Sequence, residues 1–163
     1  MVDQRRTLDH VRGHLARAAK PEAIEYIRPA PSLTSVGLPA GLGEASHLVL
    51  LFLSTSCTSC LSLARRVKES ASEHLWIVLN APSVSAGWEW IDDVGLRRDA
   101  VTVDSAQEVF RGFGVGITPA ILVLRRGEVM LGQTVPSYDQ LEPLLSTDNL
   151  PSELTEADEV PAL

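Results

Sequence analysis

The chain has 163 residues, of which 45% are hydrophobic and 21% charged, and this composition is typical of a folded globular protein. Its 14 basic and 21 acidic residues give a formal net charge of −7, and no basic stripe stands out, so nucleic acid is excluded as an expected partner. The longest apolar run, Leu48 to Leu53, is too short to span a membrane. With no signal peptide in view, we expect a cytoplasmic protein; the alternative is an extracytoplasmic one whose anchor was trimmed.

Three regions are predicted along the chain. Residues 1–46 form an N-terminal helical extension and a lead-in loop, residues 47–147 form the main domain, and residues 148–163 form an acidic C-terminal tail. In the first region an amphipathic helix ends at Pro21, and Ile24 and Ile27 continue on a short second helical piece. Prolines and glycines then predict an irregular segment over 29–46.

The main domain alternates between strand and helix patterns. Strands are predicted at 47–54, 75–79 and 100–103, and a hairpin at 120–124 and 128–134 with its turn at 125–127. Helices are predicted after Cys60, around 88–94, after a capping box at 105–108, and after a second capping box at 137–140, the last one shortened or kinked by Pro143. This order predicts an α/β protein with a mixed central sheet flanked by helices.

Cys57 and Cys60 are the two cysteines of the chain, and they lie where the first predicted strand passes into a helix. Free backbone N–H groups and the helix dipole at that position lower the pKa of the first thiol, which favours a redox-active dithiol. A zinc site would need four ligands, and no such clustering is visible among His10, His14, His47 and His74. A static disulfide would close too short a loop to add much stability. We therefore expect neither a metal nor a cofactor.

The cysteine pair, followed downstream by Phe113-Gly114-Val115-Gly116-Ile117-Thr118-Pro119 and a hairpin, resembles thioredoxin-like proteins over residues 47–146. The resemblance implies a thioredoxin fold in which Pro119 is cis and lies beside the disulfide. It also implies that Thr118 offers backbone hydrogen bonds to an extended substrate, while Thr58 and Ser59 adjoin the substrate and their N–H groups support the thiolate. The implied partners are a protein thiol or disulfide substrate and a redox partner that recycles the dithiol.

The chain departs from thioredoxins themselves at several positions. Thr58 and Ser59 replace the common Gly-Pro pair, and Ser56 stands where a tryptophan often precedes the first cysteine. The stretch 50–52 supplies no buried acid, so the proton of the resolving thiol must pass to water or to a distant group such as Glu44 or Asp104, or its transfer must be slow. The long lead-in and a central insertion around 88–96 resemble the TlpA/ResA-like and MauD-like branch, whose members are usually anchored outside the cytoplasmic membrane.

These patterns predict a thiol–disulfide oxidoreductase. Cys57 is expected to attack a substrate disulfide and form a mixed disulfide, which Cys60 then resolves. The alternative is a non-catalytic adaptor of the same fold, which binds a partner through the groove at Pro119 and makes no use of its cysteines.

Overall fold

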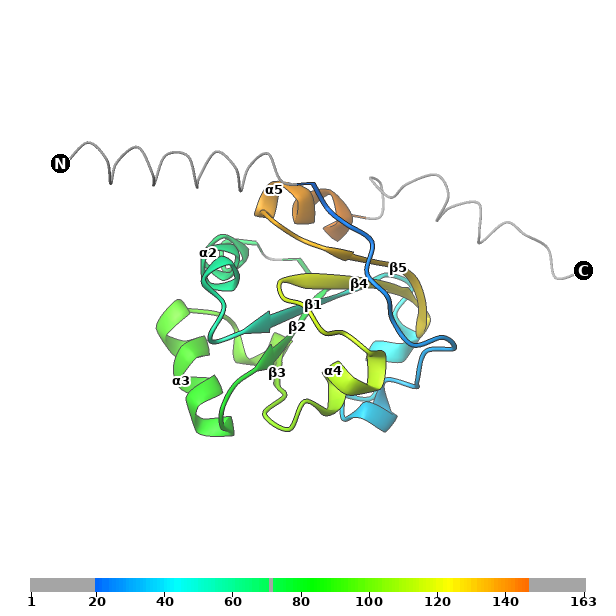
Figure 1. Ribbon diagram of the computed structural model, residues 1–163, viewed down its shortest axis with the longest axis horizontal. Coiled ribbons are helices and arrows are strands. Elements are labelled where there is room, and N and C mark those ends of the chain that lie inside the picture. The colour runs from blue at the N-terminus through cyan, green and yellow to red at the C-terminus, as the bar shows by residue number, and fades with distance from the viewer. Residues whose placement is uncertain (1–19, 71, 147–163) are drawn as a thin grey trace, which may run out of the picture.

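The computed structural model describes residues 20–70 and 72–146, in which helices cover both faces of a five-stranded mixed sheet (Figure 1). The strands lie in the order β3–β2–β1–β4–β5; β1 is parallel to β2, β2 is parallel to β3, β4 is antiparallel to β1, and β5 is antiparallel to β4. Their bounds are Leu48–Ser54 (β1), Leu75–Asn80 (β2), Val101–Val103 (β3), Ala120–Arg125 (β4) and Glu128–Thr134 (β5). The predicted α/β class is therefore confirmed.

The helices pack as two unequal layers. Helices α2, α3 and α5 share one hydrophobic cluster with the sheet, whereas α4 and the 3₁₀ turn η1 share the other. Their bounds are Thr58–Val67 (α2), Val84–Val94 (α3), Glu108–Phe113 (α4) and Tyr138–Leu141 (α5), with 3₁₀ turns at Thr34–Val36 (η1), Leu42–Glu44 (η2), Arg98–Ala100 (η3) and Glu142–Leu145 (η4). The segment predicted as a central insertion is thus α3 and the turn after it.

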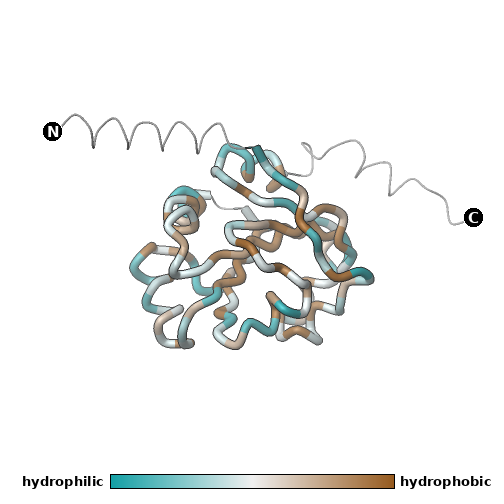
Figure 2. The backbone as a smooth tube through the Cα atoms, viewed as in Figure 1, coloured by the Kyte–Doolittle hydropathy of each residue, from teal (hydrophilic) through white to brown (hydrophobic). Residues whose placement is uncertain are grey.

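Strand β1 lies at the centre of the sheet and is buried along its whole length. Because successive side chains of a strand point to opposite faces, Val49, Leu51 and Leu53 enter the α2–α3–α5 cluster while Leu50 and Phe52 enter the α4 cluster. Figure 2 shows the hydrophobic residues gathered along the central strands. The continuous apolar run therefore serves a strand with helices on both sides, as the sequence predicts.

Residues 21–27 do not form the short helical piece predicted for Ile24 and Ile27. They run extended along the outer edge of β5 and then cross to the end of α4 (blue in Figure 1). Three backbone hydrogen bonds hold them: Thr134 N–H to Glu22 O (2.8 Å), Ile24 N–H to Gly132 O (3.1 Å) and Ile27 N–H to Phe113 O (2.8 Å). The prediction was wrong because a free sheet edge supplies backbone partners that no local periodicity reveals.

Neither predicted capping box forms. Helix α4 begins only at Glu108, and the carboxylate of Asp104 takes the place of the Ser105 hydroxyl by accepting the Val109 and Phe110 N–H groups at 3.0 and 3.1 Å. Helix α5 does begin after Ser137, but without a side-chain cap. Its α-helical part ends at Leu141, and the chain continues as the 3₁₀ turn that contains Pro143, so the predicted shortening is confirmed.

The predictions for the two ends of the chain fall largely outside the described residues. The amphipathic helix before Pro21 and the acidic tail at 148–163 lie there, and the division of the chain at residue 46 stays a prediction. Leu33, Val36 and Leu38 of the lead-in segment are buried in the α4 cluster. None of the described helices is both long and apolar enough to cross a bilayer.

His47, just before β1, forms a hydrogen bond that links the start of this strand to the 3₁₀ turn η4. The side chain is buried, and its Nε2 lies 2.7 Å from the Leu144 carbonyl oxygen of η4. Because a carbonyl only accepts, Nε2 donates and the neutral ring carries no proton on Nδ1, which is buried and has no hydrogen-bond partner among the described residues. Burial lowers the pKa of His47 below 6.5, opposed by the Leu144 hydrogen bond and aided by His74 and Arg125.

We expect the free energy of unfolding to fall as the pH drops below 6.5. The unfolded chain, in which His47 keeps its ordinary pKa, binds the proton first, so the contribution of His47 is complete above that pH and is lost toward the lowered pKa of the folded state. Urea unfolding between about pH 7.5 and 5.5 measures the effect. A His47→Gln variant should lose stability less steeply over this range, and an unchanged pH dependence would assign the effect to another group.

Candidate active site

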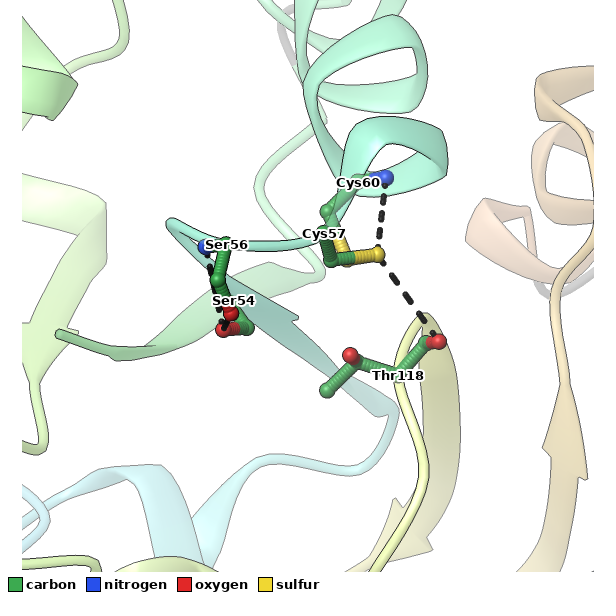
Figure 3. The surroundings of a disulfide bond; sticks show 5 residues. All are labelled: Ser54, Ser56, Cys57, Cys60 and Thr118. Atoms are coloured by element: carbon green, nitrogen blue, oxygen red, sulfur yellow. Dashed lines mark hydrogen bonds between the residues drawn. A yellow bond between two sulfur atoms is a disulfide. The ribbon is translucent and has the colours of Figure 1, made fainter.

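The end of β1 places the two cysteines at the first turn of α2. Cys57 is the N-cap residue of this helix, with extended backbone, and Cys60 lies within its first turn. The two residues form a disulfide, with their Cα atoms 5.1 Å apart (Figure 3). A helix start directly after a central strand thus brings the two sulfur atoms together over the carboxyl-terminal edge of the sheet.

The two sulfur-bearing residues differ in exposure. Cys57 is partly exposed, whereas Cys60 is fully buried against the α2–α3–α5 cluster. A reagent or a partner protein approaching from solvent therefore meets the Cys57 side first. This asymmetry is the arrangement that an attacking thiol and a resolving thiol need.

Backbone groups supply the electrostatics around Cys57. The Cys60 N–H donates to Cys57 Sγ at 3.1 Å, and the N-terminal end of α2 adds its partial positive charge. The chain from Leu48 to Ala64 contains no Asp, Glu, Lys or Arg. A Cys57 thiolate would therefore be stabilised by oriented N–H groups, with no side-chain cation supplied by this stretch of the chain.

The loop before β4 brings Thr118 and Pro119 to the cysteine pair. Ala120, the next residue, pairs with Phe52 of β1, and the Thr118 carbonyl oxygen lies 3.8 Å from Cys57 Sγ (Figure 3). A Cys57 thiol could donate a hydrogen bond to this oxygen, whereas the disulfide has no S–H. The Thr118–Pro119 peptide bond is cis, and the Pro119 carbonyl accepts a hydrogen bond from the Val135 N–H at 3.1 Å.

Thr58 and Ser59 are exposed at the first two positions of α2. Ser59 lines a hollow of about 270 Å³ between α2 and the start of α5. Arg66 lines the same hollow, with its guanidinium carbon 5.0 Å from the centre of the Tyr138 ring. The structure thus brings Ser59 to a groove beside the cysteines, whereas Thr58 faces open solvent.

One feature of the site was missed from the sequence: the serines that precede Cys57. The Ser54 carbonyl accepts the Cys57 N–H at 3.2 Å, and the Ser54 hydroxyl accepts the Ser56 N–H at 3.3 Å and lies 3.0 Å from the Ser56 hydroxyl. Both serines line a second hollow, of about 280 Å³, together with Asn80, Ser105 and Gln107. The clustering of Ser and Thr before Cys57 was the available signal, since these residues favour such turns.

The two acids considered for proton transfer occupy different places. Glu44 lies at the end of the sheet away from the cysteines. The carbonyl of the next residue, Ala45, accepts a hydrogen bond from the Arg126 N–H in the β4–β5 turn. Asp104 follows β3 at the same edge as Cys57, but one of its oxygens accepts the two N–H groups that begin α4. Glu44 is thus too remote to serve, and Asp104 has a structural role.

No group of three or more His, Cys, Asp and Glu side chains within the described residues is placed to hold a metal ion. His47 and His74 do meet edge to face, with ring centroids 5.1 Å apart, but at the end of β1 remote from the cysteines. His10 and His14 lie outside the described residues.

Comparisons with known proteins rest on structure. No family model matches the chain, and no curated protein matches its sequence. Solved structures do match. A secreted Mycobacterium tuberculosis disulfide oxidoreductase homologous to E. coli DsbE gives a TM-score of 0.52 at 21% identity, covering 71% of this chain and 92% of that chain.

Two further structures give the same picture. StoA from Bacillus subtilis has a TM-score of 0.51 at 15% identity, covering 63% of this chain and 84% of its own. A thiol:disulfide interchange protein of the thioredoxin family from Chlorobium tepidum has a TM-score of 0.50 at 18% identity, covering 78% and 95%. The chain has the thioredoxin fold. At these identities the likeness shows the fold alone.

Proposed function

We propose that this protein is a thiol–disulfide oxidoreductase that acts on protein substrates through Cys57 and Cys60. The observation that carries the proposal is the asymmetry of the pair: a partly exposed Cys57 at the start of α2, disulfide-bonded to a fully buried Cys60. The structural neighbours support it, because one is described as a disulfide oxidoreductase and another as a thiol:disulfide interchange protein. Placement in the TlpA/ResA-like or MauD-like branch is part of the same proposal.

In the reducing direction the Cys57 thiolate attacks one sulfur of a substrate disulfide. The substrate S–S bond breaks, a Cys57–substrate disulfide forms, and the departing thiolate takes a proton from water. Cys60 then loses its proton and attacks Cys57 Sγ, which releases the second substrate thiolate and forms the Cys57–Cys60 disulfide. Two electrons pass to the substrate, and the reverse sequence oxidises a substrate dithiol.

The surrounding residues position the substrate and the thiolate. The Cys60 N–H, 3.1 Å from Cys57 Sγ, would hold the negative charge on that sulfur. Thr118 and Pro119, next to the same sulfur, would bind an extended substrate segment through the Thr118 backbone, with Thr58 and Ser59 on the opposite side. Water is the acceptor that we assign to the Cys60 proton, since Glu44 is remote and Asp104 is engaged with α4.

The chemistry needs no cofactor or metal, since the two sulfur atoms carry both electrons. It does need a second partner, a dithiol or disulfide protein that returns the pair to its working state. The Mycobacterium tuberculosis neighbour is described as secreted, which favours the extracytoplasmic location over the cytoplasmic one.

The midpoint potential of the Cys57–Cys60 couple tests the proposal. The protein is equilibrated in graded dithiol buffers and its free thiols are labelled and counted. We expect one reversible two-electron couple; a value near about −270 mV would mark a reductase, and one near about −120 to −180 mV an oxidant or isomerase. Absence of a reversible couple would contradict the enzyme hypothesis. The adaptor hypothesis would then remain, in which the protein binds a partner at the Pro119 groove and catalyses no reaction.

A further inference from the structure

Ser54 sits where the central strand ends and the cysteine turn begins. It is the last residue of β1, is 9% exposed, and pairs in register with Asn80 of β2. Its backbone is therefore fixed by the sheet, while its side chain lies beside the turn that carries Cys57 (Figure 3). Ser54 therefore connects the central strand β1 to the turn that carries Cys57.

Two groups of Ser54 hold two successive residues of this turn. The carbonyl accepts the Cys57 N–H at 3.2 Å, and the hydroxyl accepts the Ser56 N–H at 3.3 Å. The hydroxyl also lies 3.0 Å from the Ser56 hydroxyl. The carbonyl belongs to the backbone and is present whatever residue stands at position 54. Of the two hydrogen-bond acceptors, only the hydroxyl therefore depends on the residue type.

We propose that Ser54 is the positioning residue of the Cys57 nucleophile, an inference that rests on the proposed function. By fixing the Ser56 N–H, the hydroxyl sets the backbone direction from which Cys57 enters α2. That direction holds Cys57 Sγ at 3.1 Å from the Cys60 N–H. Ser54 thus acts on the chemistry through the turn, by way of Ser56.

Removal of the hydroxyl has a predictable sequence of effects. The Ser56 N–H loses its acceptor in a part-buried turn, and the turn gains freedom. The Cys57 sulfur then spends less time within reach of the Cys60 N–H and the helix N-terminus. Because those groups favour the thiolate, the pKa of Cys57 rises and the fraction of reactive thiolate near neutral pH falls.

The test compares side chains of matched shape. Ser54→Thr keeps the hydroxyl and Ser54→Val has the same shape without it, so any steric effect of branching is common to both; Ser54→Ala is the plain deletion. Ser83→Ala is the control, because the Ser83 hydroxyl likewise accepts a backbone N–H, that of Ala86 at 3.1 Å, but at the start of α3. Each reduced protein is alkylated with iodoacetamide across the pH range, and its thermal midpoint is recorded.

We expect Ser54→Ala and Ser54→Val to react about five- to tenfold more slowly at neutral pH, with the alkylation profile shifted to higher pH, the size of effect that one lost hydrogen bond gives. Ser54→Thr and Ser83→Ala should keep the wild-type profile. Equal profiles for the Thr and Val variants would overturn the inference, as would a Ser83→Ala profile shifted as far as that of Ser54→Ala. If the wild-type protein itself shows no reversible couple, the proposed function fails, which is a separate outcome.

Discussion

Replacing Cys60 with serine is expected to leave the protein joined to its substrates through Cys57. The resolving thiol is held one helical turn from Cys57, and an attack from that position acts at an effective concentration far above that of any free thiol. Without it, release from the mixed disulfide should slow by at least about a hundredfold. Non-reducing electrophoresis of Cys60→Ser incubated with a disulfide-containing protein should show covalent adducts, which dithiothreitol should cleave by reducing the mixed disulfide.

Cys57→Ser is the matched control for that experiment. Cys60 is fully buried, so it should neither replace Cys57 in attack nor form adducts, and turnover should be lost. Adducts of equal yield in both variants would contradict the assignment of Cys57 as the nucleophile. A partner that binds both variants and the wild-type protein equally, with no covalent product in any of them, would favour the adaptor.

The candidate site was predictable to the extent that it is local. The apolar run before Cys57 and the helical spacing after Cys60 place both cysteines at a strand-to-helix junction, and the structure has that junction. Thr118 and Pro119 lie far from the cysteines in sequence. Only the resemblance to thioredoxin-like proteins predicted that they lie beside the cysteine pair in the fold. The Thr118 carbonyl does lie beside Cys57 Sγ, while the roles of these residues stay predictions.

What the sequence did not predict is which group becomes the hydrogen-bond partner of a segment's backbone. Ile24 and Ile27 have helical spacing, yet the open edge of β5 draws their segment into extended pairing. Ser105 opens a correct capping-box pattern, yet the buried Asp104 carboxylate reaches the N–H groups of α4 instead. In both cases the local pattern was present, but another acceptor took the backbone N–H groups: the edge of a remote strand for Ile24, and for α4 the carboxylate of Asp104, five and six residues before Val109 and Phe110.

Truncating Phe52 to alanine is expected to cost the largest amount of stability among single core changes near the site. Phe52 is fully buried and meets two rings of α4 edge to face, Phe110 at 5.0 Å and Phe113 at 6.4 Å between centroids. Loss of such a ring removes its burial and leaves a cavity, which together cost about 3–5 kcal/mol. Urea unfolding of Phe52→Ala, with Val84→Ala as an exposed apolar control, measures this difference.

A second substitution at the same position tests how tightly the α4 layer packs on the sheet beside the site. Phe52 pairs through its backbone with Ala120, which directly follows Pro119, and the side chains of Phe52 and Ala120 both belong to the α4 cluster. Phe52→Leu should retain most of the stability because it refills much of the volume. A loss below about 1 kcal/mol in Phe52→Ala would contradict the packing described for this face, since a fully buried ring cannot be removed at so small a cost unless its neighbours close the space.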